Sequence, residues 1–312
     1  MRKALIIGIN DYPNARLDSC ISDASAFANV IGTHSDGSPN FGVRLETNVQ
    51  KKSELNNLII ELFQGKNDVA LLYFSGHGAL DETGGYIVTP DYEKNDVGIS
   101  MDYILNLVNQ SETKDKIIIL DCCHSGQMGS PKTSYGTSQI KEGVTILTAS
   151  RDVESAIEVN GHGLFTNLLL GALQGGASDL RGHVTPGSIY AYIDQALGPW
   201  EQRPVFKTNV TRFTVLRNVT EPIQINILRK ITEYFQLPEY VYPLNPSYEY
   251  TKKKQAIKKN VEIFKNLQKM ERVGLVVPVE EEHMYYAAIR SKSCKLTALG
   301  AHYWRLVKEE RV

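Results

Sequence analysis

The chain has 312 residues, of which 42% are hydrophobic and 22% are charged, as in an ordinary soluble globular protein. Its four cysteines are too few for a disulfide framework in a chain of this length, so we expect a reducing, cytoplasmic compartment. Its apolar runs are far shorter than the roughly 18 residues that a membrane span needs, which excludes a transmembrane protein.

The small net charge of −1 hides an asymmetry along the chain. Residues 1–220 carry 18 basic and 24 acidic side chains, whereas residues 221–312 carry 16 basic and 11 acidic ones. An acidic body followed by a basic tail indicates two parts with different partners. We therefore predict a main domain over residues 1–217 and a small basic recognition or regulatory domain over residues 222–312.

The main domain alternates short apolar runs with segments of helical periodicity, a pattern typical of a mostly parallel α/β sheet between two layers of helices. The expected strands are Lys3–Ile9, Asp68–Ser75, Lys116–Asp121 and Gly143–Ala149. The expected helices are Asp18–Ile31, Lys52–Gln64, Ser100–Val108, Gly163–Leu173 and Pro186–Leu197. Thr185 and Pro186 provide a start signal for the last of these helices. A long segment rich in small polar residues, 125–143, interrupts the alternation.

The tail predicts a small α+β domain whose order of elements is compatible with a winged helix. The expected elements are a helix at Ile223–Phe235, a long basic helix at Tyr248–Arg272, strands at Gly274–Val279 and Met284–Arg290, and a helix at Thr297–Val307. Lysines on the long helix would suit phosphate binding, but glutamates interrupt the basic field. We therefore favour a protein partner over nucleic acid for this domain.

Two motifs stand at the ends of apolar strands and carry the chemistry. One is Ser75-Gly76-His77-Gly78, and the other is Asp121-Cys122-Cys123-His124-Ser125-Gly126. The carboxyl ends of parallel strands meet at one edge of a sheet, so a histidine there can activate a cysteine thiol. Side chains alternate along a strand, which places Asp121 with Cys123, and Ser75 with His77. This alternation favours Cys123 over Cys122 as the nucleophile and turns His124 away from it.

These motifs resemble those of the caspase-like clan CD cysteine peptidases, and most closely those of the metacaspase and bacterial orthocaspase branch. The resemblance covers about residues 1–217. Supporting matches are Ala4–Asn10 at the first strand, Thr148-Ala149-Ser150 after the cysteine, and Gly163-Leu164-Phe165-Thr166 at the start of a helix.

The resemblance implies a cysteine endopeptidase that cleaves after Arg or Lys through a Cys123–His77 dyad and a thioester intermediate. It implies that main-chain N–H groups of Gly78 and Cys123 stabilise the oxyanion. The acidic S1 pocket of the branch matches Cys20, Asp23, Ser75 and Asp121. No third triad member is apparent, and we expect no role for the histidines outside the two motifs, namely His34, His162, His183, His283 and His302.

The resemblance implies no required cofactor, although many members of the branch are activated by calcium. Four residues are candidate calcium ligands by type alone, namely Asp91, Glu93, Asp96 and Asp102. A solvated acidic loop is the interpretation that we favour for them. The cysteines and histidines lack the spacing of a zinc site, so we expect no metal.

Regulation and alternatives complete these expectations. The loop after Cys123 contains Lys132 and Lys141, which are candidate sites of self-cleavage. The resemblance to proteases with small appended domains implies a role in bacterial defence or cell death.

The rival hypothesis is a catalytically silent adaptor that acts through its C-terminal domain. A third hypothesis keeps the thioester but transfers the acyl group to an amine.

Overall fold

The computed structural model describes residues 1–82, 84–94, 96–122, 128, 139–149, 158–159, 162–197 and 204–312. These residues form two compact units, Met1–Thr220 and Glu221–Val312. Among the helices of the described residues, none is long and apolar enough to cross a membrane.

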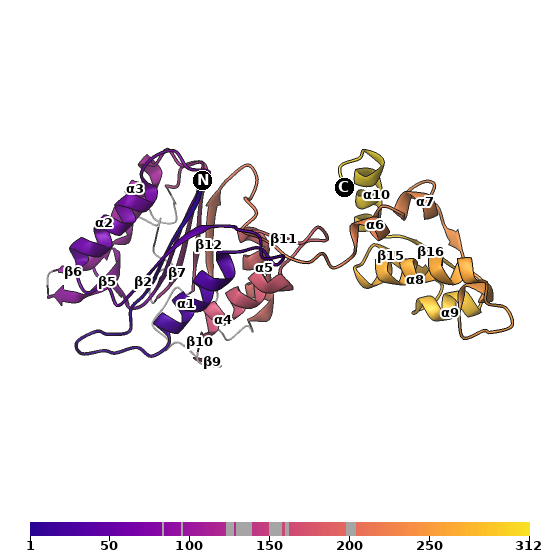
Figure 1. Cartoon of the computed structure of the whole chain (residues 1–312), viewed down its shortest axis with the longest axis horizontal. Coiled ribbons are helices and arrows are strands. Elements are labelled where there is room, and N and C mark those ends of the chain that lie inside the picture. Colours follow the sequence, from indigo (N-terminus) through magenta and orange to yellow (C-terminus); the bar gives the residue numbers. More distant parts are fainter. Residues whose placement is uncertain are drawn as a thin grey trace. The chain divides into compact units, whose positions relative to one another are not determined.

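The first unit is built on a six-stranded sheet with the strand order β12-β8-β7-β3-β1-β2 (Figure 1). Its strands are β1 (Arg2–Gly8), β2 (Gly42–Thr47), β3 (Val69–Ser75), β7 (Asp115–Asp121), β8 (Val144–Thr148) and β12 (Val205–Asn209). Neighbouring strands are parallel except β12, which pairs with β8 in the antiparallel sense. The expected mostly parallel α/β sheet is therefore confirmed. The two edge strands lack a fully apolar run, which is why the sequence did not predict them.

Helices cover both faces of this sheet (Figure 1). One face packs against α2 (Lys52–Phe63) and α3 (Met101–Gln110), and the other against α1 (Cys20–Ile31), α4 (Leu164–Gly171) and α5 (Pro186–Ala196). Strand residues alternate between the two cores, as Tyr73 and Phe74 do in β3. The predicted start of α5 is confirmed, because the Thr185 hydroxyl accepts a hydrogen bond from the Ser188 N–H at 3.2 Å.

Several small elements surround the main sheet. A three-stranded antiparallel sheet follows His77 and consists of β4 (Gly78–Leu80), β5 (Gly85–Glu93) and β6 (Asp96–Ser100). Two-residue strands form two further pairs, β9 (Glu158–Val159) with β10 (His162–Gly163), and β11 (His183–Val184) with β13 (Arg217–Asn218). The π-helix η2 (Ala172–Gly176) extends α4.

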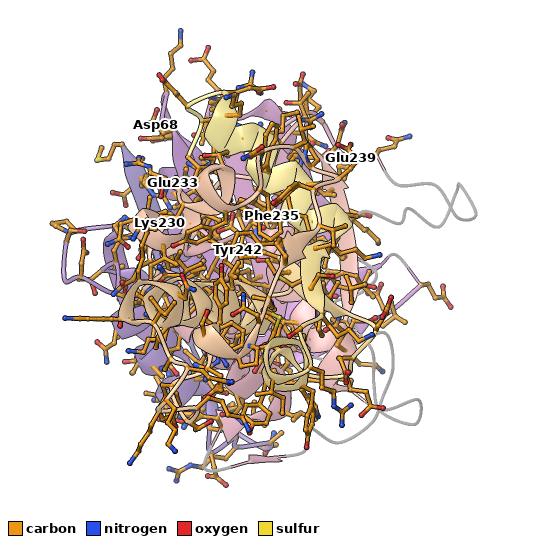
Figure 2. The ribbon with its side chains drawn as sticks, turned by 90° about the vertical axis from the view of Figure 1, so that its right-hand side faces the viewer. Asp68, Lys230, Glu233, Phe235, Glu239 and Tyr242 are labelled. Carbon is orange, nitrogen blue, oxygen red and sulfur yellow. The ribbon has the colours of Figure 1, made fainter. Side chains whose placement is uncertain are left out.

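The second unit packs helices against a three-stranded antiparallel sheet with the strand order β14-β16-β15. Its elements are α6 (Ile225–Leu228), α7 (Ile231–Tyr234), β14 (Tyr242–Pro243), η3 (Pro246–Tyr248), α8 (Lys258–Arg272), β15 (Val276–Val279), α9 (Met284–Ile289), β16 (Ser293–Leu296) and α10 (Ala298–Lys308). The aromatic rings of Phe235 and Tyr242 lie 6.0 Å apart and join the helices to β14 (Figure 2).

Three predictions for the tail need correction. The segment Met284–Arg290, expected as a strand, forms helix α9, because Met284, Ala287 and Ala288 are buried at helical rather than alternating spacing. The long basic helix begins at Lys258, ten residues later than expected, because a 3-10 turn and further turns precede it. The first helix is divided into α6 and α7.

Candidate active site

The two motif-bearing strands lie side by side in register. Ser75 at the end of β3 pairs with Asp121 at the end of β7, and the Gly76 N–H donates to the Asp121 main-chain oxygen at 3.4 Å. His77 therefore leaves the sheet beside the point where the cysteine motif begins. Cys123, Lys132 and His124 lie outside the described residues.

Main-chain and ring contacts hold His77 in one orientation. Its Nε2 lies 2.6 Å from the main-chain oxygen of Ala15, and because a carbonyl can only accept, Nε2 carries the hydrogen. This contact leaves Nδ1 as the ring nitrogen for proton exchange. The Tyr12 ring packs edge-on against the imidazole with centroids 4.6 Å apart, and its hydroxyl accepts from the His77 N–H at 3.0 Å.

The glycine before His77 is required by close packing. A Cβ on Gly76 would lie 2.6 Å from the Tyr12 hydroxyl oxygen and 2.7 Å from the Phe74 ring, distances at which atoms overlap. Gly78, the expected oxyanion donor, follows His77 directly and opens β4, where it pairs with Ile87. The segment is thus held between Tyr12 and β5.

Alternation along β7 separates the side chains of its last residues. Asp121 follows Ile117 and Ile119, which face the core under α1 and α4, whereas Cys122 is buried in the opposite core under α2 and α3. The Asp121 carboxylate accordingly accepts a hydrogen bond from Thr166 in α4. The direction expected for Cys122, away from Asp121, is what the structure has.

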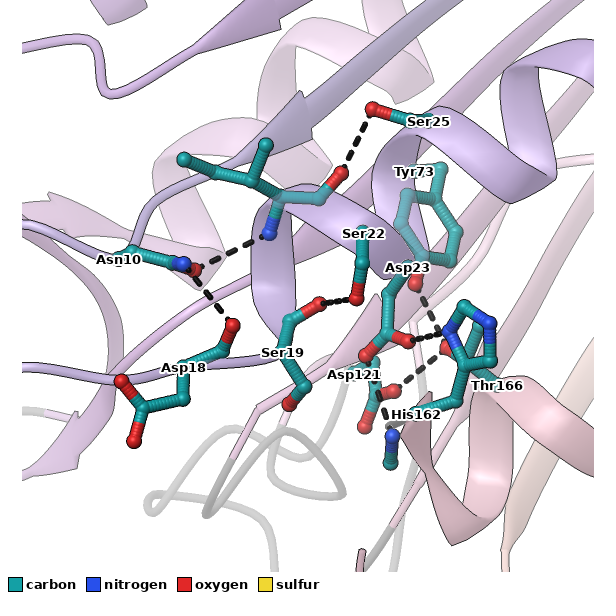
Figure 3. Close-up of polar contacts among 12 residues, drawn as sticks. Asn10, Asp18, Ser19, Ser22, Asp23, Ser25, Tyr73, Asp121, His162 and Thr166 are labelled. Atoms are coloured by element: carbon teal, nitrogen blue, oxygen red, sulfur yellow. Dashed lines mark hydrogen bonds and ion pairs between the residues drawn. The ribbon is translucent and has the colours of Figure 1, made fainter. Parts of the chain in front are cut away.

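Two carboxylates converge on the α1 and α4 side of the sheet (Figure 3). Asp23 in α1 is 1% exposed, and Asp121 is half-buried at the end of β7. A Cβ placed on Gly163 would lie 3.4 Å from Asp23 Oδ2 and 3.3 Å from Asp121 Oδ2, so both carboxylates lie close to the same main-chain position. We call Asp23 and Asp121 the acidic pair.

Asn10 follows strand β1 and holds the start of α1, the helix that carries Asp23. Its side-chain oxygen accepts from the Ile21 N–H at 3.1 Å, and its side-chain nitrogen donates to the Asp18 oxygen at 3.1 Å (Figure 3). An amide that accepts from the first turn of a helix determines where the helix begins. The end of β1 thereby orients α1 and its acidic residue.

A short hydrogen-bond chain supports Asp121 (Figure 3). The Thr166 hydroxyl donates to Asp121 Oδ2 at 2.6 Å and, having one hydrogen, accepts from the Tyr73 hydroxyl at 2.6 Å. Burial raises the pKa of Asp121 to about 6; the bond from Thr166 opposes this rise, and the negative charge of Asp23 adds to it.

The pKa of the buried Tyr73 hydroxyl indicates which groups gather around it. Burial raises this pKa well above its usual value, and the charges of Asp121, Asp23 and Cys20 raise it further. Three of the four expected pocket residues are thus near enough to Tyr73 to affect its pKa. The fourth, Ser75, is buried two residues farther along the same strand.

A family model, the caspase domain, matches residues 1–215. The chain belongs to the caspase domain family. The match spans the six-stranded sheet, both helical layers and the two strand-end motifs, and it supports a cysteine peptidase acting on proteins in general. No curated protein matches the chain.

A solved structure shares the fold of this caspase domain. The protein GSU0716 from Geobacter sulfurreducens is 16% identical, with a TM-score of 0.52 over 70% of this chain and 99% of that one. Caspase-1 from Spodoptera frugiperda is 15% identical, with a TM-score of 0.47 over 70% of this chain and 90% of that one. At 16% identity the likeness to GSU0716 concerns the fold alone.

Other predicted residues lie away from the acidic pair. Lys141, a candidate self-cleavage site, precedes β8 at the end of the sheet where the parallel strands begin. His77 lies at the opposite end, where these strands finish. A cavity of about 1210 Å³ also lies near the end where the strands begin, and Arg2, Asp115 and Arg212 line it. The strand ends that precede His77 and Cys123 are at the opposite end of the sheet.

Two of the four calcium candidates, Asp91 and Asp96, have other partners. The Asp91 carboxylate accepts from the Lys52 N–H at 3.0 Å and so caps α2, while Asp96 forms an ion pair with the Lys52 side chain. Within the part of the chain that the structure describes, no three acidic, histidine or cysteine side chains are grouped as a metal site.

Sequence reasoning missed several residues of this caspase domain. Tyr12, the Ala15 carbonyl and Tyr73 carried no recognisable signal, since each acts through a contact with a residue far along the chain. Thr166 stands in the quoted motif Gly163-Leu164-Phe165-Thr166, but its bond to Asp121 could not be inferred from it. His162, which we expected to have no role, contacts Asp23.

Proposed function

We propose that this chain is a cysteine endopeptidase that cleaves after Arg or Lys, with Cys123 as nucleophile and His77 as proton carrier. The observation that carries the proposal is the acidic pair beside the strand end from which His77 emerges. Two carboxylates in a largely buried position favour a cationic side chain, and a planar guanidinium can contact both.

The proposed reaction follows the geometry of His77. Because Ala15 holds Nε2, Nδ1 takes the thiol proton of Cys123, and the thiolate attacks the scissile carbonyl carbon. N–H groups of Gly78 and Cys123 stabilise the oxyanion. The C–N bond then breaks as His77 protonates the leaving amine. Water, deprotonated by His77, hydrolyses the thioester and the proton returns to the Cys123 sulfur.

The motifs also support a finer assignment and a form of regulation. Cys123 directly before His124-Ser125-Gly126 favours the metacaspase and orthocaspase branch. Self-processing is assigned to Lys132, since Lys141 lies at the end of the sheet opposite to His77.

The basic second unit is assigned to a protein partner. Its Cys294 is a buried thiol whose pKa burial raises to about 12, so we assign it no chemistry.

The test is hydrolysis of matched fluorogenic peptides ending in Arg, Lys or Asp, by wild type and Cys123→Ala, with and without calcium. Turnover after Arg or Lys that the substitution abolishes is the expected result. Turnover only after Asp would contradict the role of the acidic pair. A ligated peptide instead of two fragments would indicate acyl transfer, and inactivity under every condition would favour the adaptor hypothesis.

A further inference from the structure

Among the described residues, His162 is a basic side chain that contacts the acidic pair directly. Its Nδ1 lies 2.6 Å from Asp23 Oδ1, and its side chain is 25% exposed, whereas Asp23 is 1% exposed (Figure 3). A contact this short between an imidazole nitrogen and a carboxylate oxygen is a charge-assisted hydrogen bond. The carboxylate is thus already engaged by a nitrogen donor of the chain itself.

One short segment brings this donor and its neighbours to both carboxylates. His162 and Gly163 form β10, and the Gly163 N–H donates to Asp23 Oδ2 at 3.3 Å. The helix that follows supplies Thr166, which donates to Asp121. Three residues of this five-residue segment therefore contact the acidic pair, and of the three only His162 can carry a positive charge.

The negative charges of the acidic pair explain why a nitrogen donor such as His162 is needed when no substrate is bound. Two carboxylates that converge in a largely buried place repel each other and lose solvation, a cost reflected in the raised pKa of Asp121. An imidazole on Asp23 offsets part of this cost. A substrate side chain with a permanent charge would offset more of it, so the imidazole and the substrate cation compete for the Asp23 carboxylate.

The two partners differ in how firmly they are held. Asp23 sits within α1, and its carboxylate is fixed by bonds from both His162 and Gly163. His162 lies in a strand of two residues that pairs with another strand of two residues. A substrate side chain that binds Asp23 therefore displaces the His162 imidazole and leaves the carboxylate in place.

We propose that His162 is an internal placeholder for the basic side chain of the substrate, which displaces the imidazole from Asp23 on binding. The inference rests on the proposed function and makes His162 a specificity-determining residue. An uncharged side chain cannot compensate Asp23 once the imidazole has left. The placeholder therefore lowers the affinity for every substrate and lowers it most for those without a cation.

The test compares His162→Ala with a matched control, His183→Ala. His183 is also paired with an aspartate, at 3.5 Å from Asp179, and its side chain is similarly exposed, but it lies in β11. We expect His162→Ala to lower KM for the Arg-ending peptide about 10-fold at unchanged kcat, because a hydrogen bond to a charged group no longer has to be broken. The affinity for propylguanidinium, which copies the arginine side chain, should rise equally. His183→Ala should change neither.

A second measurement is made on the unaltered protein and does not depend on the folding of His162→Ala. Propylguanidinium should shift one imidazole signal in the NMR spectrum of the wild-type chain, the signal that His162→Asn removes, whereas propylurea should not. Unchanged or weaker propylguanidinium binding by His162→Ala, or an unmoved His162 signal at saturation, overturns the inference alone if wild type still cleaves after Arg or Lys. If neither protein binds propylguanidinium nor cleaves after basic residues, the proposed function falls and the inference with it.

Discussion

The imidazole of His77 is anchored to the main chain at Ala15, whose oxygen lies 2.6 Å from Nε2, although the two residues are 62 positions apart. A main-chain acceptor cannot be removed by changing the side chain at position 15. The orientation of His77 is therefore best tested through Tyr12, which contacts both its ring and its N–H.

Tyr12→Phe should lower kcat about 10-fold and leave KM for an Arg-ending peptide unchanged. The variant keeps the ring against His77 but loses the hydroxyl that accepts from the His77 N–H and donates to the Val88 oxygen, and a lost hydrogen bond is worth about 1 kcal/mol. Steady-state kinetics over a range of pH would measure this, because a displaced imidazole also alters the pH profile. The control is Tyr103→Phe, an exposed tyrosine on α3. A change in KM alone would contradict a role for Tyr12 in positioning His77.

Asp121→Asn should reduce kcat/KM for Arg- and Lys-ending peptides at least about 100-fold, because one charge of a buried pair with substrate is lost. The matched control is Asp115→Asn, at the other end of the same strand, which should retain wild-type activity. Equal losses in the two variants would indicate damage to β7 rather than to substrate recognition.

The pH dependence of substrate binding should follow the ionisation of Asp121. Since its pKa in the folded chain is about 6, KM for the Arg-ending peptide should fall as pH rises from 5 to 7, when the carboxylate becomes charged. Asp121→Asn should lack this part of the profile. An identical KM profile in the two proteins would assign the titration to another group.

The same ionisation should lower the free energy of unfolding as pH rises, although it strengthens substrate binding. The pKa of Asp121 in the folded state lies above the usual 3.8, because the fold favours the protonated carboxyl. The stabilisation that this gives is therefore complete below pH 4 and is lost as pH rises through 6. We expect a loss of about 1–2 kcal/mol, since the side chain is only half-buried. Denaturant unfolding of wild type and Asp121→Asn between pH 4 and 7.5 would measure it, and the stability difference between them should shift in favour of the variant as pH rises.

Thr166→Val should raise the pKa of Asp121 further, because the threonine hydroxyl stabilises the charged carboxylate. The acid limb of the KM profile should consequently move to higher pH, and Thr166→Ser should restore it. Loss of activity without any shift in the profile, in both variants, would indicate a packing role for the threonine methyl group.

Gly76→Ala should destabilise the chain by about 1–3 kcal/mol, because its Cβ would overlap the Tyr12 hydroxyl and the Phe74 ring. Gly42→Ala is the control, since its Cβ would meet only the Arg2 oxygen at an ordinary 3.6 Å. Thermal unfolding of both variants would measure the difference. Equal stability of the two would show that the backbone at Gly76 can move aside.

Local sequence pattern predicted some elements of the tail and misjudged others. Met284–Ile289 combines tyrosines, which favour strands, with alanines, which favour helices. Packing decided between them, because a helix buries Met284, Ala287 and Ala288 together. The capped helix α10, by contrast, was predicted nearly to the residue, since Thr297 caps it locally.

The sequence by itself determined the α/β sheet and the strand ends that carry His77 and Asp121, because apolar runs and their alternation are local signals of burial and direction. Only the tertiary structure decided which groups these residues meet. His162 contacts Asp23 across 139 positions, and Thr166 contacts Asp121 across 45. Such contacts depend on how α1, α4 and β7 pack together, and no periodicity within one segment encodes the distance to another.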